Sequence, residues 1–189
     1  MKVDWISLNI KGLVNPKIIE NCFSEYFIPY VFIDGKLNIK SHELIQKYKV
    51  YIHQYTGVKG YWTGTKISFS GKNAHYFYGL LKTQKFDWSL LQVNNITVSL
   101  GRIDLCFSLL TGLSHTNKSF DAFLLNSRSY VQNNTSTKYI KMQDFPNGKM
   151  LKINRRNNSQ HYRIYQKDES IRFELELKHR QAKRILSSF

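Results

Sequence analysis

Residues 161–167 (HYRIYQK) and 172–178 (RFELELK) decide the fold, because polar and apolar side chains alternate along them. Successive side chains of a β-strand point to opposite faces, so each segment reads as a strand with one polar face. That face carries His161, Arg163, Tyr165 and Lys167 from the first segment, and Arg172, Glu174, Glu176 and Lys178 from the second. Only residues 168–171 separate the two segments, so the sequence predicts an antiparallel hairpin.

The polar face of this hairpin has the side chains that cleavage of a phosphodiester needs. Residues 102–108 (RIDLCFS) predict a third strand, which places Asp104 on a polar face as well. Tyr165 would attack the phosphorus and leave a phosphotyrosine and a free 3′ hydroxyl. A divalent metal held by two or three carboxylates would stabilise charge on the phosphate oxygens, and Lys167 and Arg163 would neutralise phosphate.

The chain is strongly basic, and the charge is concentrated near its end. It has 189 residues and a net charge of +15, with 28 Lys and Arg against 13 Asp and Glu. Residues 149–189 hold 11 of the basic residues and only 4 of the acidic ones. Such an excess favours a polyanionic partner. With 42% hydrophobic residues, the chain is expected to form one domain over residues 1–189, with two small domains as the alternative.

Hydrophobic periodicity predicts an α+β fold with a mostly antiparallel central sheet and flanking helices. Strands are expected at residues 5–10, 66–70, 95–110, 149–153, 162–167 and 171–178. Helices are expected at residues 16–27, 41–55, 73–83, 117–133 and 179–186. Asn15 is the expected N-cap of the first helix, with Pro16 at its first position. Residues 132–138 are expected to form a polar loop.

Several common classes of protein are disfavoured by the sequence. Its six histidines form no HExxH or HxH pair, and it has no glycine-rich nucleotide-binding loop and no serine nucleophile elbow. Cys22 and Cys106 are too few and too far apart for a disulfide framework or a zinc site. Without a long apolar run or a signal-peptide pattern, the chain is expected to be soluble and intracellular, in a bacterial cytoplasm or an organelle matrix, with no membrane partner.

Four segments, in order, resemble the replication-initiator (Rep_trans) family of rolling-circle plasmids, which also includes relaxases of some integrative conjugative elements. Residues 4–9 (DWISLN) are similar to the family's opening strand, and residues 101–108 (GRIDLCFS) to its middle "TRIDLAFD" strand. Residues 154–169 resemble its "GSRKS…RIYDKxxE" block, and residues 172–178 its closing "RVELELK". The resemblance extends over almost the whole chain, and the last two segments are its most specific part.

The resemblance implies a sequence-specific DNA nicking and joining endonuclease that uses Mg²⁺ or Mn²⁺ for rolling-circle replication. Tyr165 would be the nucleophile, with Asp104 and Glu174 as metal ligands and Glu176 as a further one. Lys167 and Arg163 would contact the phosphate. The implied partner is DNA at an origin or nick site, single-stranded where it is cleaved, and a helicase and a second copy of the chain are further candidates.

Two departures from the family pattern leave a second hypothesis open. Ser108 replaces the second acid of the middle strand, and Asn154 replaces the glycine of the "GSRKS" loop. The alternative is a non-catalytic DNA- or RNA-binding protein, or a nucleoprotein subunit, with the same fold. In this alternative, the residues expected to contact phosphates are Arg155, Arg156, Arg180, Lys183 and Arg184. The enzyme would use the same contacts. The simplest interpretation of the polar strands is a solvated sheet face whose charges form ion pairs.

Overall fold

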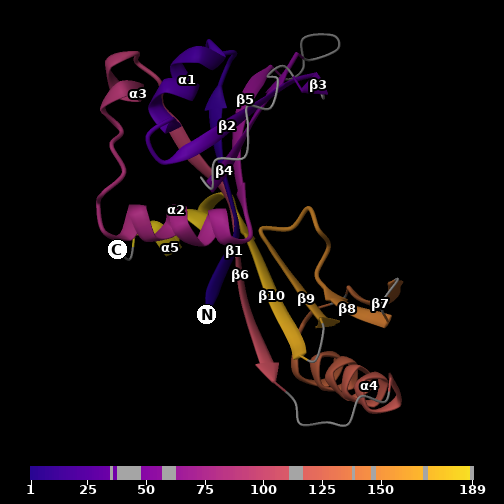
Figure 1. The fold of residues 1–189 in the computed structure, drawn as a ribbon. Coiled ribbons are helices and arrows are strands. Elements are labelled where there is room, and N and C mark those ends of the chain that lie inside the picture. Colours follow the sequence, from indigo (N-terminus) through magenta and orange to yellow (C-terminus); the bar gives the residue numbers. More distant parts are fainter. Residues whose placement is uncertain are drawn as a thin grey trace. The chain divides into compact units, whose positions relative to one another are not determined.

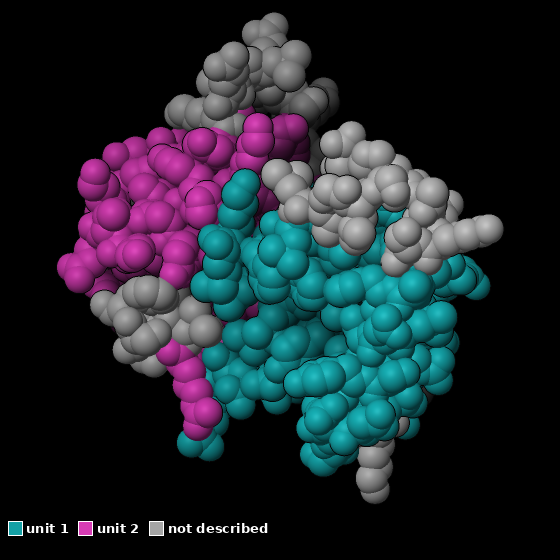
Figure 2. All heavy atoms as spheres, turned by 90° about the horizontal axis from the view of Figure 1, so that it is seen from below, with its two compact units in different colours: residues 1–2, 104–181 teal, residues 3–103, 182–189 magenta. Residues whose placement is uncertain are grey.

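A computed structural model describes residues 1–34, 36–37, 48–56, 63–110, 117–137, 139–145, 148–167 and 170–187. These residues form two compact units, coloured separately in Figure 2. The N-terminal unit comprises residues 3–103 and 182–189, and the C-terminal unit comprises residues 1–2 and 104–181. Compact units need not fold independently, so the expectation of a single domain stays a prediction.

The N-terminal unit is a sheet with strand order β3-β2-β4-β5-β1-β6 (Figure 1). Its strands are β1 (Lys2–Lys11), β2 (Phe27–Ile33), β3 (Lys36–Leu37), β4 (Tyr48–Tyr55), β5 (Gly64–Ser70) and the first half of β6 (Val98–Leu110). Its helices are α1 (Pro16–Phe23), α2 (Lys72–Lys82) and α3 (Ser89–Val93). Phe23 of α1 and Phe77 of α2 pack on Phe27 and Phe69 of the sheet, with ring centroids 3.9 to 6.1 Å apart.

The expected start of the first helix is confirmed at residue level. The Asn15 side chain accepts a hydrogen bond of 3.0 Å from the Lys17 amide, and Pro16 is the first helical residue. The helix ends at Phe23, earlier than expected, because the chain enters β2 at Phe27.

The helix expected at residues 41–55 is wrong for residues 48–55, which form β4. Val50, Ile52 and Gln54 are buried, and the residues between them are more exposed, which is the period of a strand. The strand is held between two neighbours, parallel to β2 and antiparallel to β5. Residues 41–47 lie outside the described part of the chain.

The C-terminal unit is a sheet with strand order β6-β10-β9-β8-β7, covered on one face by α4 (Asn117–Asn134; Figure 1). Its other strands are β7 (Ile140–Phe145), β8 (Gly148–Ile153), β9 (Gln160–Lys167) and β10 (Ser170–Lys178). The helix α5 (His179–Ser187) follows β10, and its residues from Ala182 on belong to the N-terminal unit. Phe120 and Leu124 of α4 pack on Leu151, Ile153 and Ile171 of the strands. The expected strands at residues 149–153, 162–167 and 171–178 are confirmed, whereas β7 was not predicted.

The predicted fold class is confirmed, since strands with mostly antiparallel pairing are flanked by helices. Among the described strand pairs whose registers are known, only β2 and β4 run parallel. No helix in the described part of the chain is long and apolar enough to span a membrane.

Leu124 anchors α4 to the sheet, so its truncation should destabilise the protein. Its side chain is fully buried, whereas the adjacent Leu125 is 54% exposed. We expect Leu124→Ala to lower the free energy of unfolding by about 2–5 kcal/mol, through reduced burial and a residual cavity. Leu125→Ala should change it by less than about 0.5 kcal/mol. Urea unfolding measures both, and equal effects would contradict the packing of α4 described above.

Candidate active site

The predicted polar face of the β9–β10 hairpin is confirmed by the strand register. Tyr165 lies opposite Arg172, Arg163 opposite Glu174, and His161 opposite Glu176. These pairs share one face, because directly opposed residues of antiparallel strands point the same way. The other face carries Ile164, Phe173 and their apolar neighbours, which pack toward α4.

Arg163 is at the centre of the polar face, where one nitrogen of its guanidinium binds two carboxylates. Its Nη2 atom lies 2.8 Å from Glu174 Oε2 and 3.3 Å from Asp104 Oδ2. The side chains of Asp104 and Glu174 are only 4% and 5% exposed. Burying two carboxylates side by side is costly unless a cation lies between them, and Arg163 supplies that cation.

The Tyr165 hydroxyl donates a hydrogen bond to Glu174 Oε1, the same oxygen that Arg172 Nε contacts at 2.9 Å. A second nitrogen of Arg172 reaches the Cys106 sulfur at 3.2 Å. Burial raises the pKa of Tyr165, and the hydrogen bond and negative charge of Glu174 raise it further, while the two arginines lower it. Tyr165 is therefore a neutral phenol at pH 7, with its proton directed at a carboxylate.

Glu176 belongs to a second polar cluster on the same strand. Its side chain is fully buried, and Lys178 Nζ lies 2.9 Å from its Oε1. The nearly buried His161 places Nδ1 3.9 Å from Glu176 Oε2. Lys178 Nζ also donates to the backbone carbonyl of Arg156, which ties the loop between β8 and β9 to this cluster.

That loop, residues 154–159, carries two predicted phosphate contacts. Arg155 and Arg156 are exposed, and the guanidinium of Arg155 lies 5.6 Å from the centre of the Tyr139 ring. Asn154, at the position where the Rep_trans pattern has a glycine, has a φ of +67°. This left-handed conformation suits glycine, and asparagine is among the residues that tolerate it best. Asn154 can therefore make the turn that a glycine would make.

The structure brings together only part of the predicted set of site residues. Asp104, Arg163, Tyr165 and Glu174 form one network of direct contacts, and Glu176 lies in the neighbouring cluster. Lys167 is exposed, two residues beyond Tyr165 on the same face. Arg180, Lys183 and Arg184 are exposed on α5. Ser108, at the position where the Rep_trans pattern has an acid, is exposed on β6.

The interpretation of the polar strands as a solvated face is wrong for the carboxylates, but the ion pairs that it expected do form, among them Arg172 with Glu174 at 2.9 Å. The side chains of Asp104, Glu174 and Glu176 are only 4%, 5% and 0% exposed. Sequence reasoning also assigned no site role to Arg172, Lys178 and His161, which complete the two clusters. The sequence signal that could have identified these three residues is the alternation along the strands, which places them on the polar face.

The cluster of Asp104, Arg163, Tyr165 and Glu174 can hold a divalent metal only if Arg163 moves. Two carboxylates from different strands meet at one positive charge, and carboxylate oxygens are the ligands that Mg²⁺ and Mn²⁺ prefer. Within the described residues, no three His, Cys, Asp or Glu side chains gather as metal ligands. Asp104 and Glu174 would therefore hold a metal in exchange for the Arg163 guanidinium.

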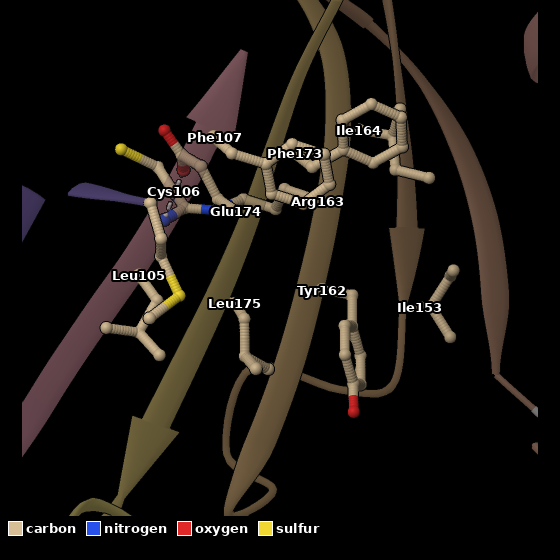
Figure 3. A pocket seen from close by; sticks show the side chains of 11 residues that line it. Leu105, Cys106, Phe107, Ile153, Tyr162, Arg163, Ile164, Phe173, Glu174 and Leu175 are labelled. Atoms are coloured by element: carbon tan, nitrogen blue, oxygen red, sulfur yellow. Dashed lines mark ion pairs between the residues drawn. The ribbon is translucent and has the colours of Figure 1, made fainter. Parts of the chain in front are cut away.

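A cavity of about 230 Å³ adjoins these strands (Figure 3). Apolar side chains form most of its lining, among them Leu105, Phe107, Phe173 and Leu175. The Phe107 and Phe173 rings stack with centroids 4.6 Å apart. Arg163 and Glu174 of the polar face also line this cavity, but its mostly apolar lining does not suit a phosphate. We therefore place the candidate chemistry on the polar face of the strands.

Comparison with known proteins supports the fold. No protein-family model matches the chain, and a search of curated proteins gives no match. Among solved structures, the chain is similar to a rolling circle replication initiator protein from Geobacillus stearothermophilus, with a TM-score of 0.52 and 14% sequence identity. The match covers 98% of this chain and 77% of the other. The chain therefore shares the fold of a replication initiator over nearly its whole length.

Arg163 should be a large contributor to stability, because its removal leaves two buried carboxylates without their shared cation. We expect Arg163→Met to lower the free energy of unfolding at pH 7 by about 3–5 kcal/mol. Lys167→Met, on the same face of the same strand but exposed, should change it by less than about 0.5 kcal/mol. Urea unfolding compares the two variants, and a small effect at Arg163 would refute its central role.

Proposed function

We propose that the chain is a rolling-circle replication initiator or relaxase that nicks and rejoins DNA through Tyr165. The observation that carries the proposal is the hydrogen bond from the Tyr165 hydroxyl to Glu174, inside a buried cluster that also holds Asp104, Arg163 and Arg172. The shared fold of a replication initiator supports the same conclusion. The proposed partner is DNA, single-stranded at the point of cleavage.

In the proposed reaction, the Tyr165 oxygen attacks the phosphorus of the scissile phosphodiester. Because the pKa of Tyr165 is raised, the phenol loses its proton as the new bond forms, and Glu174 accepts that proton. The bond from phosphorus to the 3′ oxygen breaks, and that oxygen takes up a proton from water. The products are a 5′ phosphotyrosine and a free 3′ hydroxyl, and the reverse reaction rejoins the strand.

The cations around Tyr165 would bind the phosphate and stabilise the charge that develops on it. Arg163 and Arg172 lie within contact of the carboxylate that accepts the tyrosine proton. Lys167, exposed on the same face, would contact the adjoining phosphate. Arg155 and Arg156 lie on a loop that Lys178 holds in place, so they are suited to bind the strand on either side of the scissile bond.

We also propose that Asp104 and Glu174 hold Mg²⁺ or Mn²⁺ in the active protein, with Glu176 as a further candidate ligand. When bound, the ion would withdraw charge from the non-bridging phosphate oxygens. Binding would release Arg163 from the two carboxylates and make its guanidinium available to phosphate.

Removal of the Tyr165 hydroxyl should abolish covalent attachment to DNA. We expect the unaltered protein, with Mn²⁺ and single-stranded oligonucleotides covering the origin of its replicon, to give a nicked strand and a protein–DNA adduct. Tyr165→Phe should give neither, because no other hydroxyl occupies its position. Denaturing gel electrophoresis measures both products.

Tyr162→Phe is the matched control, since Tyr162 lies on the same strand but packs on the opposite face, toward α4. It should leave cleavage within about two-fold of the unaltered protein. An adduct in Tyr165→Phe would exclude Tyr165 as the nucleophile. Tight binding without cleavage by any of the three proteins would favour the non-catalytic binding protein instead.

The proposed metal ligands can be tested by thermal unfolding. Ligand binding to the folded state alone raises the melting temperature, so Mn²⁺ should raise it saturably. The double variant Asp104→Asn, Glu174→Gln should lose this effect. Asp121→Asn, which removes a carboxylate paired with Lys149 elsewhere in the same unit, should keep it. An equal Mn²⁺ effect in all three proteins would contradict the ligand assignment.

A further inference from the structure

The sheet of the N-terminal unit has two faces of different character. The pairings of β2, β4 and β5 place Phe27, Val31, Ile52 and Phe69 on one face, which Phe23 and Phe77 of the helices cover. The opposite face carries Tyr30 and Phe32 from β2, Tyr51, His53 and Tyr55 from β4, and Lys66 from β5. We call these six residues and Lys49 of β4 the aromatic face.

The aromatic side chains of this face form a continuous row that remains partly accessible. The rings of Phe32 and His53 are stacked, with centroids 5.0 Å apart and planes 11° from parallel. His53 and Tyr55 are stacked at 6.1 Å and 10°, and Tyr30 lies 6.0 Å from Tyr51. Tyr55 is 37% exposed, and the other rings are half-buried. Aromatic residues of a folded core are normally covered, so an accessible row of rings points to a ligand with flat apolar surfaces.

The charges of the aromatic face are positive. Lys49 Nζ lies 5.3 Å from the centre of the Tyr30 ring, and Lys66 is the cross-strand neighbour of His53. Burial, with the nearby Lys66 charge, lowers the pKa of His53, so its ring is neutral at pH 7 and stacks without a charge. Within the described residues, the strand positions of this face on β1, β2, β4 and β5 contain no Asp or Glu. The ligand that fits is therefore anionic as well as flat.

We propose that the aromatic face binds a single-stranded nucleic acid, whose bases stack on the row of rings while Lys49 and Lys66 neutralise its phosphates. A single strand is the polymer that offers both features, because its bases are free to leave their own stack and each one lies beside a phosphate. Duplex DNA keeps its bases stacked inside and would meet only the two lysines. The site is built from residues outside the proposed nicking site, so it does not depend on the chemistry proposed for Tyr165.

The test is fluorescence anisotropy with labelled oligodeoxythymidine and oligouridine strands of roughly 12 nucleotides, a length within the usual range of such sites. All proteins carry Tyr165→Phe, so that binding is measured without cleavage. Tyr51→Leu should weaken binding about five-fold or more, because stacking on a ring contributes that much per base. Tyr51→Phe, which keeps the ring, should bind as the parent does.

Tyr76→Leu is the matched control, because this half-buried tyrosine of α2 stacks on Tyr48 at the helix-covered face. It should leave the affinity unchanged, and circular dichroism checks that every variant is folded. The pair Lys49→Gln, Lys66→Gln should reduce the slope of log affinity against log salt by about 0.7 for each phosphate that is no longer neutralised. Whichever strand binds more tightly identifies the nucleic acid. Equal affinity of Tyr51→Leu and its parent for both strands would overturn the proposal.

Discussion

The polar side of the C-terminal unit depends on one interaction, the binding of Asp104 and Glu174 by the Arg163 guanidinium. Without a cation between them, two carboxylates this deeply buried would repel each other, and no other interaction would compensate for their lost hydration. Because Arg163 holds Glu174 in place, Glu174 can accept the Tyr165 hydrogen bond, and Arg172 completes the arrangement from the opposed strand position. The same interaction therefore supports the fold and positions the candidate nucleophile.

The two faces of the β9–β10 hairpin have different roles: one contributes to the stability of the core, and the other carries the residues of the proposed chemistry. On one face, Ile164 and Phe173 contribute to the core that α4 covers. On the other face, ionised groups are buried in pairs, an arrangement that rarely adds net stability compared with an apolar core. Its cost is consistent with a functional role, since perturbed titratable groups gather where chemistry occurs. The tether from Lys178 to the Arg156 carbonyl extends this organised region to the basic loop.

The C-terminal hairpin could be predicted because its alternation is strict, and alternation assigns each of its side chains to one of the two faces. The prediction of a helix up to residue 55 was wrong because residues 48–55 are stabilised as a strand by pairing with β2 and β5. The local sequence does not show which strands will pair. For the same reason β2 and β7 were not predicted.

The composition of the site was only partly predictable. The contact between Asp104 and Arg163 joins residues far apart in the sequence, and both were predicted from the sequence as site residues, but their contact was not. The burial of the carboxylates could not be predicted from the sequence, because alternation assigns a side chain to a face and does not say whether solvent reaches that face. The positive φ of Asn154 likewise became visible only in the structure, where it shows that asparagine makes a turn of the kind that glycine favours.

The most direct test of the central claim is to identify which residue carries the nucleotide after cleavage. The protein–DNA adduct would be digested with nuclease and trypsin and analysed by mass spectrometry. Cleavage after Arg163 and Lys167 releases a peptide with Tyr165 as its only tyrosine, separate from the peptide that contains Tyr162. The account predicts a nucleotide on the Tyr165 peptide alone. A nucleotide on any other residue would show that the network around Arg163 does not perform the chemistry.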